Sequence, residues 1–406
     1  MSITLKIILA ACFVALILVS CTSNGIVRLS PIQSPKVFTL KAPAAGNYPQ
    51  GLYKYPYKAG TLEEELFTQT IEWSPKVNKT FNTSTQYTAI LTLDPVNKQR
   101  TFEGTVVADI VGLPTNGVES VSVENSDRSL TIRIVFEKTA NENAAAQLIF
   151  SDDFEGTSLD TRKWETCPEW DRQGRSTWKN DMVSVSGGLL HLKFKRDPEL
   201  GKQKSGNKTL ADNWIRAGAV RTRKQEWPWD MLFENAFGYY EARIKFPVVS
   251  GTWGAFWLMS PTQGITSDEG RDGTEIDIIE SINNHRGRYN AALHWNGYGS
   301  QHKSTGSGDN NTLPVDIYDG EFHIIALDWS PSEYVFYVDG QVFWRTDGGA
   351  QFNNSGINQN PNYIKLTIES AADSNGSSWA GDIPSGFSEA EMLVDYVRVY
   401  NQPVLK

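Results

Sequence analysis

The sequence has 406 residues, of which 40% are hydrophobic and 21% are charged. This balance excludes a largely disordered chain and a chain that lies mostly within a membrane, and the length predicts about two or three domains. The formal net charge of −9 is uneven, because residues 1–150 hold 13 Lys and Arg against 12 Asp and Glu (13 − 12 = +1) and residues 151–406 hold 25 against 35 (25 − 35 = −10). The acidic second part argues against nucleic acid as a partner, since phosphate binding requires clustered Lys and Arg.

Residues 6–21 carry the pattern of an export signal. Lys6 precedes an apolar run that ends in the tetrapeptide LVSC, whose last residue is Cys21. The run is shorter than the ~18–20 apolar residues that span a bilayer, so it predicts a signal peptide over residues 1–20. The tetrapeptide resembles a bacterial lipobox, which implies that Cys21 is lipidated and that acyl chains anchor an exported protein to the cell envelope, facing the exterior. An ordinary signal peptide that is cleaved nearby is the alternative.

The next two segments differ in composition. Residues 21–60 contain five prolines and little periodicity, which predicts a tether. Residues 61–140 contain short β-branched runs, such as TQYTAILTLD and SLTIRIVFEK, with turn signals between them. This pattern predicts a small β-sandwich module of the immunoglobulin-like kind. We expect the module to act as a spacer, with sugar binding as the alternative, because Trp73 is its single tryptophan.

Residues 148–402 are predicted to form a second all-β domain. About ten short runs of alternating or β-branched residues are separated by Gly, Pro, Asn and Asp, and no amphipathic helix of ordinary length stands out. The pattern predicts a two-sheet antiparallel sandwich of the jelly-roll type. Twelve of the 13 tryptophans lie in this part of the chain, and the three cysteines are too few for a disulfide framework or a zinc site.

The densest chemical signal is the segment GTEIDIIES, residues 273–281. Glu275 and Asp277 share one face of a strand, whereas Glu280 has the opposite parity. A β-bulge between Asp277 and Glu280 would return Glu280 to the face of the other two, so that all three line one cleft. Crowded carboxylates shift one another's pKa, which leaves one protonated and another ionised near neutrality, as retaining glycoside hydrolysis requires. A calcium site or a solvated acidic strand is the alternative.

The pattern Glu275-x-Asp277-x-x-Glu280 resembles the signature of glycoside hydrolase family 16, in its bulged-motif, laminarinase-like branch. The resemblance covers about residues 150–401. It implies a β-jelly-roll in which Glu275 is the nucleophile, Asp277 its assistant and Glu280 the acid/base, with no cofactor for catalysis. Further flanks also look like the family: 237–243, 251–257, 336–340 and 394–400.

The same resemblance implies sugar-binding residues. Trp253 and Trp257 lie four apart in one run and so share a face, and in the family tryptophans at these places bound the subsite beside the cleaved bond; burial in the core is the alternative. His294 resembles the family histidine near the acid/base, and Arg243 is a further candidate for substrate binding. Three tryptophans in loop-like segments are candidates for outer subsites: Trp227, Trp229 and Trp379.

The resemblance also implies a structural calcium ion held by Asp395 and the backbone carbonyl of Gly188. The favoured function is a retaining endo-hydrolase of β-1,3- or β-1,3-1,4-glucan, acting as a monomer on a polysaccharide. Two alternatives stay open: a galactan hydrolase of the agarase, porphyranase or carrageenase type, and a non-catalytic glucan-binding surface protein. Gly254 and the long turn after His294 depart from the usual laminarinase pattern and leave the substrate open.

Overall fold

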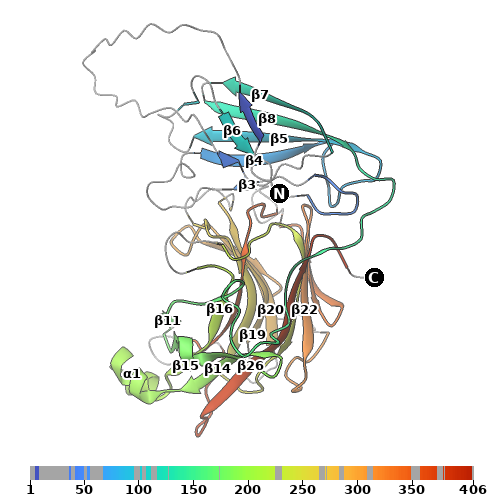
Figure 1. The fold of residues 1–406 in the computed structure, drawn as a ribbon. Coiled ribbons are helices and arrows are strands. Elements are labelled where there is room, and N and C mark those ends of the chain that lie inside the picture. The colour runs from blue at the N-terminus through green and yellow to red at the C-terminus, as the bar shows by residue number, and fades with distance from the viewer. Residues whose placement is uncertain are drawn as a thin grey trace, which may run out of the picture. The chain divides into compact units, whose positions relative to one another are not determined.

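The computed structural model divides into two units, residues 1–145 and 146–406, which are described separately (Figure 1). The predicted signal peptide lies outside the described residues except for the strand Leu5–Ile8, and Cys21 lies outside them altogether. The structure describes residues 5–8, 36–37, 42–49, 53–54, 67–95, 101–102, 107–110, 117–126, 128–172, 174–224, 231–264, 270, 272–282, 288–308, 314–348, 357–372, 378 and 380–404.

The first unit is built on a five-stranded antiparallel sheet with the order β3-β4-β5-β8-β7. Burial alternates along β4, β5 and β8, as the alternating sequence predicts, and the buried side chains form a core around Trp73. A second sheet has the order β1-β6-β2. The strands are β1 (Leu5–Ile8), β2 (Lys36–Val37), β3 (Tyr53–Lys54), β4 (Phe67–Ser74), β5 (Gln86–Pro95), β6 (Val107–Ile110), β7 (Val118–Ser126) and β8 (Ser129–Lys138).

The second unit is a β-sandwich, so the predicted all-β fold is confirmed (Figure 1). Its first layer is a seven-stranded antiparallel sheet with the order β10-β16-β25-β18-β19-β20-β21. The strands of this layer are β10 (Glu165–Thr166), β16 (Ala219–Arg221), β18 (Trp253–Met259), β19 (Thr274–Ile282), β20 (Arg288–Trp295), β21 (Lys303–Gly306) and β25 (Tyr363–Glu369).

The second layer is an eleven-stranded sheet with the order β11-β12-β15-β14-β26-β17-β22-β23-β24, in which β13 also pairs with β14 and β9 with β26. Its strands are β9 (Leu148–Asp152), β11 (Asp171–Arg172), β12 (Ser176–Trp178), β13 (Val183–Ser186), β14 (Leu189–Arg196), β15 (Ile215–Ala217), β17 (Gly238–Lys245), β22 (His323–Trp329), β23 (Tyr334–Val338), β24 (Gln341–Thr346) and β26 (Glu389–Tyr400).

Helices are short in the described chain: η2 (Asn180–Met182), α1 (Pro198–Lys204) and α2 (Lys208–Asp212). Helix α1 begins with Pro198 after the N-cap Asp197, whose carboxylate accepts a hydrogen bond from the Leu200 amide at 2.9 Å. No helix in the described parts of the chain has the length and apolar character needed to cross a bilayer.

The register explains which face of the seven-stranded sheet is buried. Ile276, Leu258, Ile364 and Leu293 lie opposite one another on four adjacent strands, and all four side chains are fully buried. This face therefore packs in the interior of the sandwich. The opposite face, which we call the carboxylate face, carries Glu275 and the residues that lie opposite it in the register.

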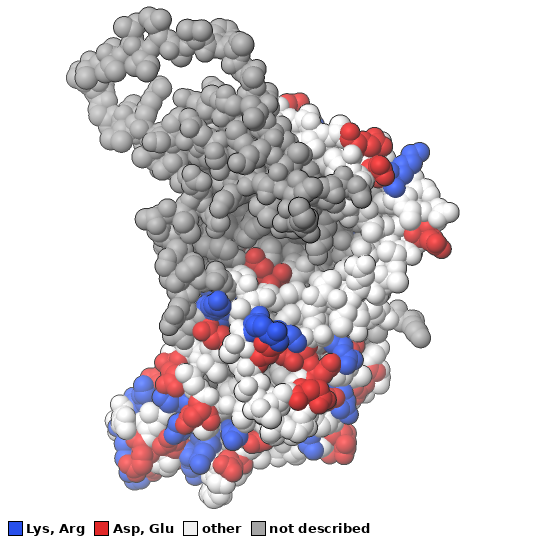
Figure 2. Space-filling view, in the orientation of Figure 1, with Lys and Arg blue, Asp and Glu red and all other residues white. Residues whose placement is uncertain are grey.

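The surface of the second unit carries both signs of charge. On the face shown in Figure 2, Lys and Arg side chains lie beside Asp and Glu side chains rather than in one separate patch. The net charge of −10 in residues 151–406 is therefore not a measure of the local charge at any one site.

Candidate active site

Strand β19 contains the irregularity that the sequence predicts. Its pairing with β20 shifts register between Asp277, which lies opposite Ala292, and Glu280, which lies opposite Asn290. Three steps on β19 thus correspond to two steps on β20, which is a β-bulge. The bulge returns Glu280 to the carboxylate face, where the register with β18 places it opposite Ala255. The predicted bulge is confirmed.

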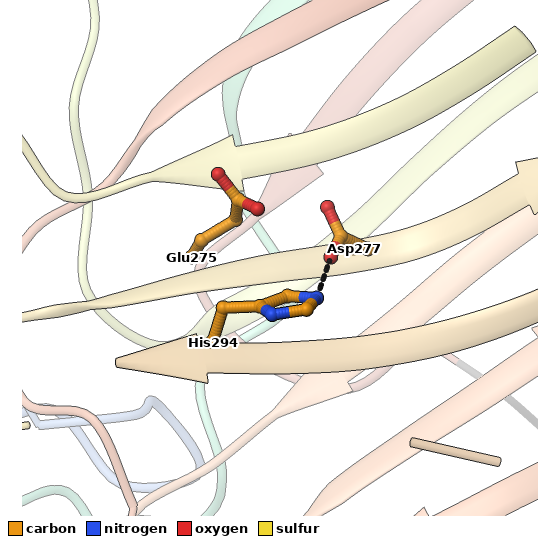
Figure 3. Close-up of side chains that lie close together, drawn as sticks. All are labelled: Glu275, Asp277 and His294. Atoms are coloured by element: carbon orange, nitrogen blue, oxygen red, sulfur yellow. Dashed lines mark ion pairs between the residues drawn. The ribbon is translucent and has the colours of Figure 1, made fainter. Parts of the chain in front are cut away.

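The first group of side chains on this face comes from two neighbouring strands. Glu275 and Asp277 project from β19, and His294 projects from β20 directly opposite Glu275 (Figure 3). The His294 Nε2 atom lies 3.4 Å from Asp277 Oδ2. Glu275 and Asp277 are only 8% and 5% exposed, so their charges interact through a medium of low dielectric.

These three residues also meet the geometric requirement of a metal site, because one ligand atom from each lies within 4.8 Å of the others. Protein partners already contact them: the Tyr298 hydroxyl donates to Glu275, and His294 contacts Asp277. The three residues therefore have protein partners as well as the spacing of metal ligands.

Glu280 has different partners from Glu275. The Trp253 indole N–H donates to Glu280 Oε1 at 3.0 Å, and the Asn290 side-chain amide donates to Glu280 Oε2 at 2.7 Å. Both oxygens of this carboxyl are thereby held in fixed directions. Neighbouring strands supply both donors, since Trp253 begins β18 and Asn290 lies on β20.

The surroundings shift the titration of all these groups. Burial, reinforced by the negative charge of Asp277, raises the pKa of Glu275 to about 7 and that of Glu280 to about 8. Burial alone would lower the pKa of His294, but its hydrogen bond to Asp277 and the charges of the carboxylates raise that pKa to about 9. The site therefore holds two carboxyls and an imidazole whose pKa values are all raised, so that proton transfer to and from the glutamates falls near neutral pH.

The two predicted tryptophans share the carboxylate face. Trp257 lies opposite Asp277 on one side and opposite Lys365 of β25 on the other, and its indole N–H donates to Thr367 Oγ1 at 3.1 Å. The Lys365 ammonium lies 3.7 Å from the centre of the Trp257 ring. Trp295 follows His294 on β20 and therefore points to the other face of the sheet, into the core, where it is 1% exposed.

Sequence reasoning missed four residues of this face: Asn290, Tyr298, His302 and Lys365. Asn290 and Lys365 could have been found by alternation, because Asn290 shares parity with His294, and Lys365 belongs to a polar row on β25. Tyr298 and His302 lie on the turn after β20 and in the next segment, where no periodicity applies.

A family model described as the GH16 domain of β-porphyranases A–D matches residues 146–402. The chain belongs to glycoside hydrolase family 16. Family 16 enzymes hydrolyse glycosidic bonds with retention of configuration and need no catalytic cofactor.

Three relatives within family 16 illustrate the range of substrates. A β-glucanase from Rhodothermus marinus is 26% identical over 270 residues, which are 63% of this chain and 85% of that protein. A keratan-sulfate endo-1,4-β-galactosidase from Sphingobacterium multivorum is 26% identical over 270 residues, 64% of this chain and 56% of that protein. β-Porphyranase D from Zobellia galactanivorans is 33% identical over 136 residues, 33% of this chain and 29% of that protein.

Arg243 lies elsewhere in the family 16 domain. It projects from β17 in the eleven-stranded sheet, where its guanidinium donates to Asp395 Oδ2 at 2.7 Å and lies 4.5 Å from the centre of the Phe322 ring. Strand β17 belongs to the eleven-stranded sheet and β19 to the seven-stranded sheet, and the contacts of Arg243 are with Asp395 and Phe322 rather than with the carboxylates of β19.

The same ion pair bears on the calcium site that the resemblance implies. Gly188 lies in the turn between β13 and β14, and the pairing of Leu190 with Val394 places Asp395 near this turn. The Asp395 carboxylate accepts a hydrogen bond from the Arg243 guanidinium at 2.7 Å, and the Glu155 carboxylate lies beside Gly188. The calcium site at these residues stays a prediction. Trp227, Trp229 and Trp379 lie outside the described residues.

Proposed function

We propose that the protein is an endo-hydrolase of a β-linked, sulfated galactan of the porphyran type. The proposal combines the match to the β-porphyranase family model with one observation, the cation Lys365 on the carboxylate face. Glu275 acts as the nucleophile, Glu280 as the acid/base, and Asp277 with His294 positions and polarises the nucleophile. Trp253 and Trp257 provide ring surfaces for the sugar.

Lys365 is unusual for a buried lysine. Its side chain is 6% exposed, its ammonium lies 3.7 Å from the ring of Trp257 and 5.0 Å from that of Trp178, and no carboxylate oxygen of the described residues lies within 4.0 Å of it. Burial lowers the pKa of Lys365 to about 8, which leaves it cationic at neutral pH. A buried cation costs free energy unless an anion approaches it, and a sulfate group on the substrate supplies one.

Further cations flank Lys365 on the same face. Arg221 of β16 lies directly opposite Lys365 and is 3.7 Å from Glu165, and Arg172 forms an ion pair with Glu369 at 2.8 Å. These arginines already have carboxylate partners, so Lys365 is the cation that a substrate anion would complement. An anionic group of the substrate would interact with Lys365 at close range, so the net charge of −10 in residues 151–406 does not argue against a sulfated substrate.

A β-glucan is the second candidate, and the match to a β-glucanase over 85% of that relative's length supports it. The two candidates are separated by reducing-end release from porphyran, agarose, κ-carrageenan, laminarin and lichenan. We expect cleavage of porphyran, and a fall in kcat/KM of about tenfold or more for Lys365→Met on porphyran with a smaller fall on neutral agarose. Preferential cleavage of laminarin or lichenan would support the glucan candidate instead.

We also propose that the protein is exported and anchored through lipid on Cys21, on the support of the lipobox-like tetrapeptide that ends in this residue. A Cys21→Ala variant should lose its partition into detergent in phase-separation experiments. Unchanged partition would contradict the lipid anchor.

A further inference from the structure

We propose that Tyr298 is an additional active-site residue, which holds Glu275 ionised and oriented as the nucleophile. The inference rests on the family 16 reaction and does not depend on which polysaccharide is cleaved. It starts from a single contact, in which the Tyr298 hydroxyl donates a hydrogen bond to Glu275 Oε2.

The position of Tyr298 allows this contact without burying its ring. The residue is 62% exposed, yet its hydroxyl reaches a carboxyl that is only 8% exposed. The ring is also supported from one side, because it lies 5.5 Å from the His302 ring at 33°, and the His302 ring stacks on His294 at 5.2 Å and 7°. A hydrogen bond from a neutral hydroxyl to a charged carboxylate is stronger than one between neutral groups.

The turn that carries Tyr298 is conformationally defined. Asn296 and Gly297 both adopt left-handed backbone conformations, with φ of 63° and 69°. Asn296 is buried, and its side-chain oxygen accepts a hydrogen bond from the Gly270 amide at 3.1 Å. This is the long turn that distinguishes the sequence from the usual laminarinase pattern, and its effect is to direct the chain from β20 back toward the start of β19.

Charged groups from several elements also act on the pKa of Glu275. Asp277 raises the pKa of both glutamates, and His294 lowers both. Lys365 from β25 acts on Glu275 through space, and Arg172 from β11 is close enough to interact with it. Among the described residues, the Tyr298 hydroxyl is the hydrogen-bond donor to Glu275, whereas Glu280 has its own donors, Trp253 and Asn290.

The contact matters for the first chemical step. In that step a Glu275 oxygen forms a bond to the anomeric carbon, the glycosidic C–O bond breaks, and the proton of Glu280 passes to the leaving oxygen. The step requires Glu275 without a proton and Glu280 with one. Burial raises the pKa of both carboxyls, and the hydrogen bond from Tyr298 counteracts that rise at Glu275, as the one from Asn290 does at Glu280.

The test is Tyr298→Phe in the full chain, with the carboxyl of Glu275 followed by carbon-13 NMR titration and its signal assigned from Glu275→Gln. We expect the pKa of Glu275 to rise by about one unit, because a hydrogen bond to a charged group is worth at least that much. The acidic limb of kcat/KM should move to higher pH by about the same amount on any polysaccharide that the wild type cleaves. The exposed ring keeps the variant foldable.

Tyr396→Phe is the matched control, because it removes a tyrosine–carboxylate hydrogen bond of 2.8 Å, to Glu241, in the other sheet. The Tyr396→Phe variant should leave unchanged both the pKa of Glu275 and the acidic limb of kcat/KM. An unaltered Glu275 titration together with a raised KM in Tyr298→Phe would overturn the proposal and make Tyr298 a surface for sugar binding only. The NMR readout needs no substrate, so a failure of the galactan proposal would leave this test intact.

Discussion

Glu275 and Glu280 are chemically identical side chains five positions apart, and their partners make them different. Tyr298 donates to the first, and Trp253 and Asn290 donate to the second. Both are buried near the same Asp277 charge, which raises the pKa of each. Two carboxyls with elevated but unequal affinity for a proton can share one proton between them near neutral pH.

The roles of the two glutamates can be separated by substitution. Glu275→Ala should abolish cleavage of every substrate, since no glycosyl-enzyme can form without a nucleophile. Glu280→Ala should lose polysaccharide cleavage but still form the covalent intermediate from an aryl glycoside with a good leaving group, and azide should restore its turnover with retained configuration. Product configuration is measured by proton NMR. An inverted azide product from Glu280→Ala would mean that the two roles are exchanged.

The pH dependence follows from the same groups. In the wild type, activity should rise as Glu275 loses its proton near pH 7 and fall as Glu280 loses its proton near pH 8. Asp277→Asn removes a negative charge that raises both pKa values, so both limbs of kcat/KM should move to lower pH. Pre-steady-state and steady-state kinetics between pH 5 and about 10 would measure the shift. If the two limbs of the kcat/KM profile stayed at the same pH or moved to higher pH, Asp277 would not act through its charge.

Local patterns reveal part of this site. Alternation along a strand places the acids of β19 and the two tryptophans of β18 on one face, and the structure agrees. Tyr298 and His302 lie outside the strands, so the alternation of side chains along a strand does not predict their contacts. Tertiary packing sets the path of the turn that carries them. Arg243 illustrates the reverse case, because a family-like flank in the sequence leads to an ion pair on the other sheet.

At the scale of elements, the position of the turn after β20 depends on a neighbouring glycine. A Cβ atom on Gly264 would lie 2.7 Å from the Gly297 Cα atom, which is too close for the present backbone path. Gly264 also has φ of 84°, a conformation that favours glycine. The segment before β19 and the turn after β20 are thus packed backbone against backbone.

Gly264→Ala should therefore displace the turn and weaken catalysis. We expect kcat to fall by roughly ten- to a hundredfold, since a shift of about 1 Å in an active-site group has effects of this size. The control is Gly320→Ala, whose φ of 89° imposes a similar backbone penalty while its Cβ meets no atom within 4 Å. Equal activity of the two variants, measured alongside their thermal unfolding, would mean that the turn does not position active-site groups.

At the scale of the whole molecule, the hydrolase unit has its own core and contains every described residue of the proposed site. A fragment spanning residues 146–406 should fold and cleave soluble substrate with a kcat/KM within a few-fold of the full chain, because compact units with their own cores fold independently. Circular dichroism and thermal unfolding establish folding, and reducing-end release measures activity. A folded but inactive fragment would show that residues 1–145 contribute to the site.

The fold class was accessible from the sequence, while the pairing of strands was not. Short β-branched runs between turn residues predict strands and an all-β molecule. Strand β9, however, pairs with β26 through Asp152 and Val397, and β16 pairs with β25 through Ala219 and Thr367, so both pairs join strands far apart in the sequence. Such neighbours are selected by burial of the whole sandwich, since a local run of residues carries no signal about a distant partner.

The bulge in β19 reverses the direction in which the following side chains point. After Asp277, inward and outward positions exchange, so Glu280 reaches the carboxylate face and Ser281 enters the sandwich interior, fully buried. Gly254 lies opposite Ser281, donates its amide to the serine hydroxyl at 2.9 Å, and leaves no room for a side chain, since its Cβ would lie 2.8 Å from Met392 Sδ. Gly254, at which this sequence departs from the usual laminarinase pattern, therefore leaves the space and supplies the hydrogen-bond donor that the buried Ser281 requires. If the extra residue of β19 were accommodated without a bulge, strand alternation would turn Glu280 into the interior and Ser281 onto the carboxylate face, so the bulge is as essential to this site as the carboxyl groups themselves.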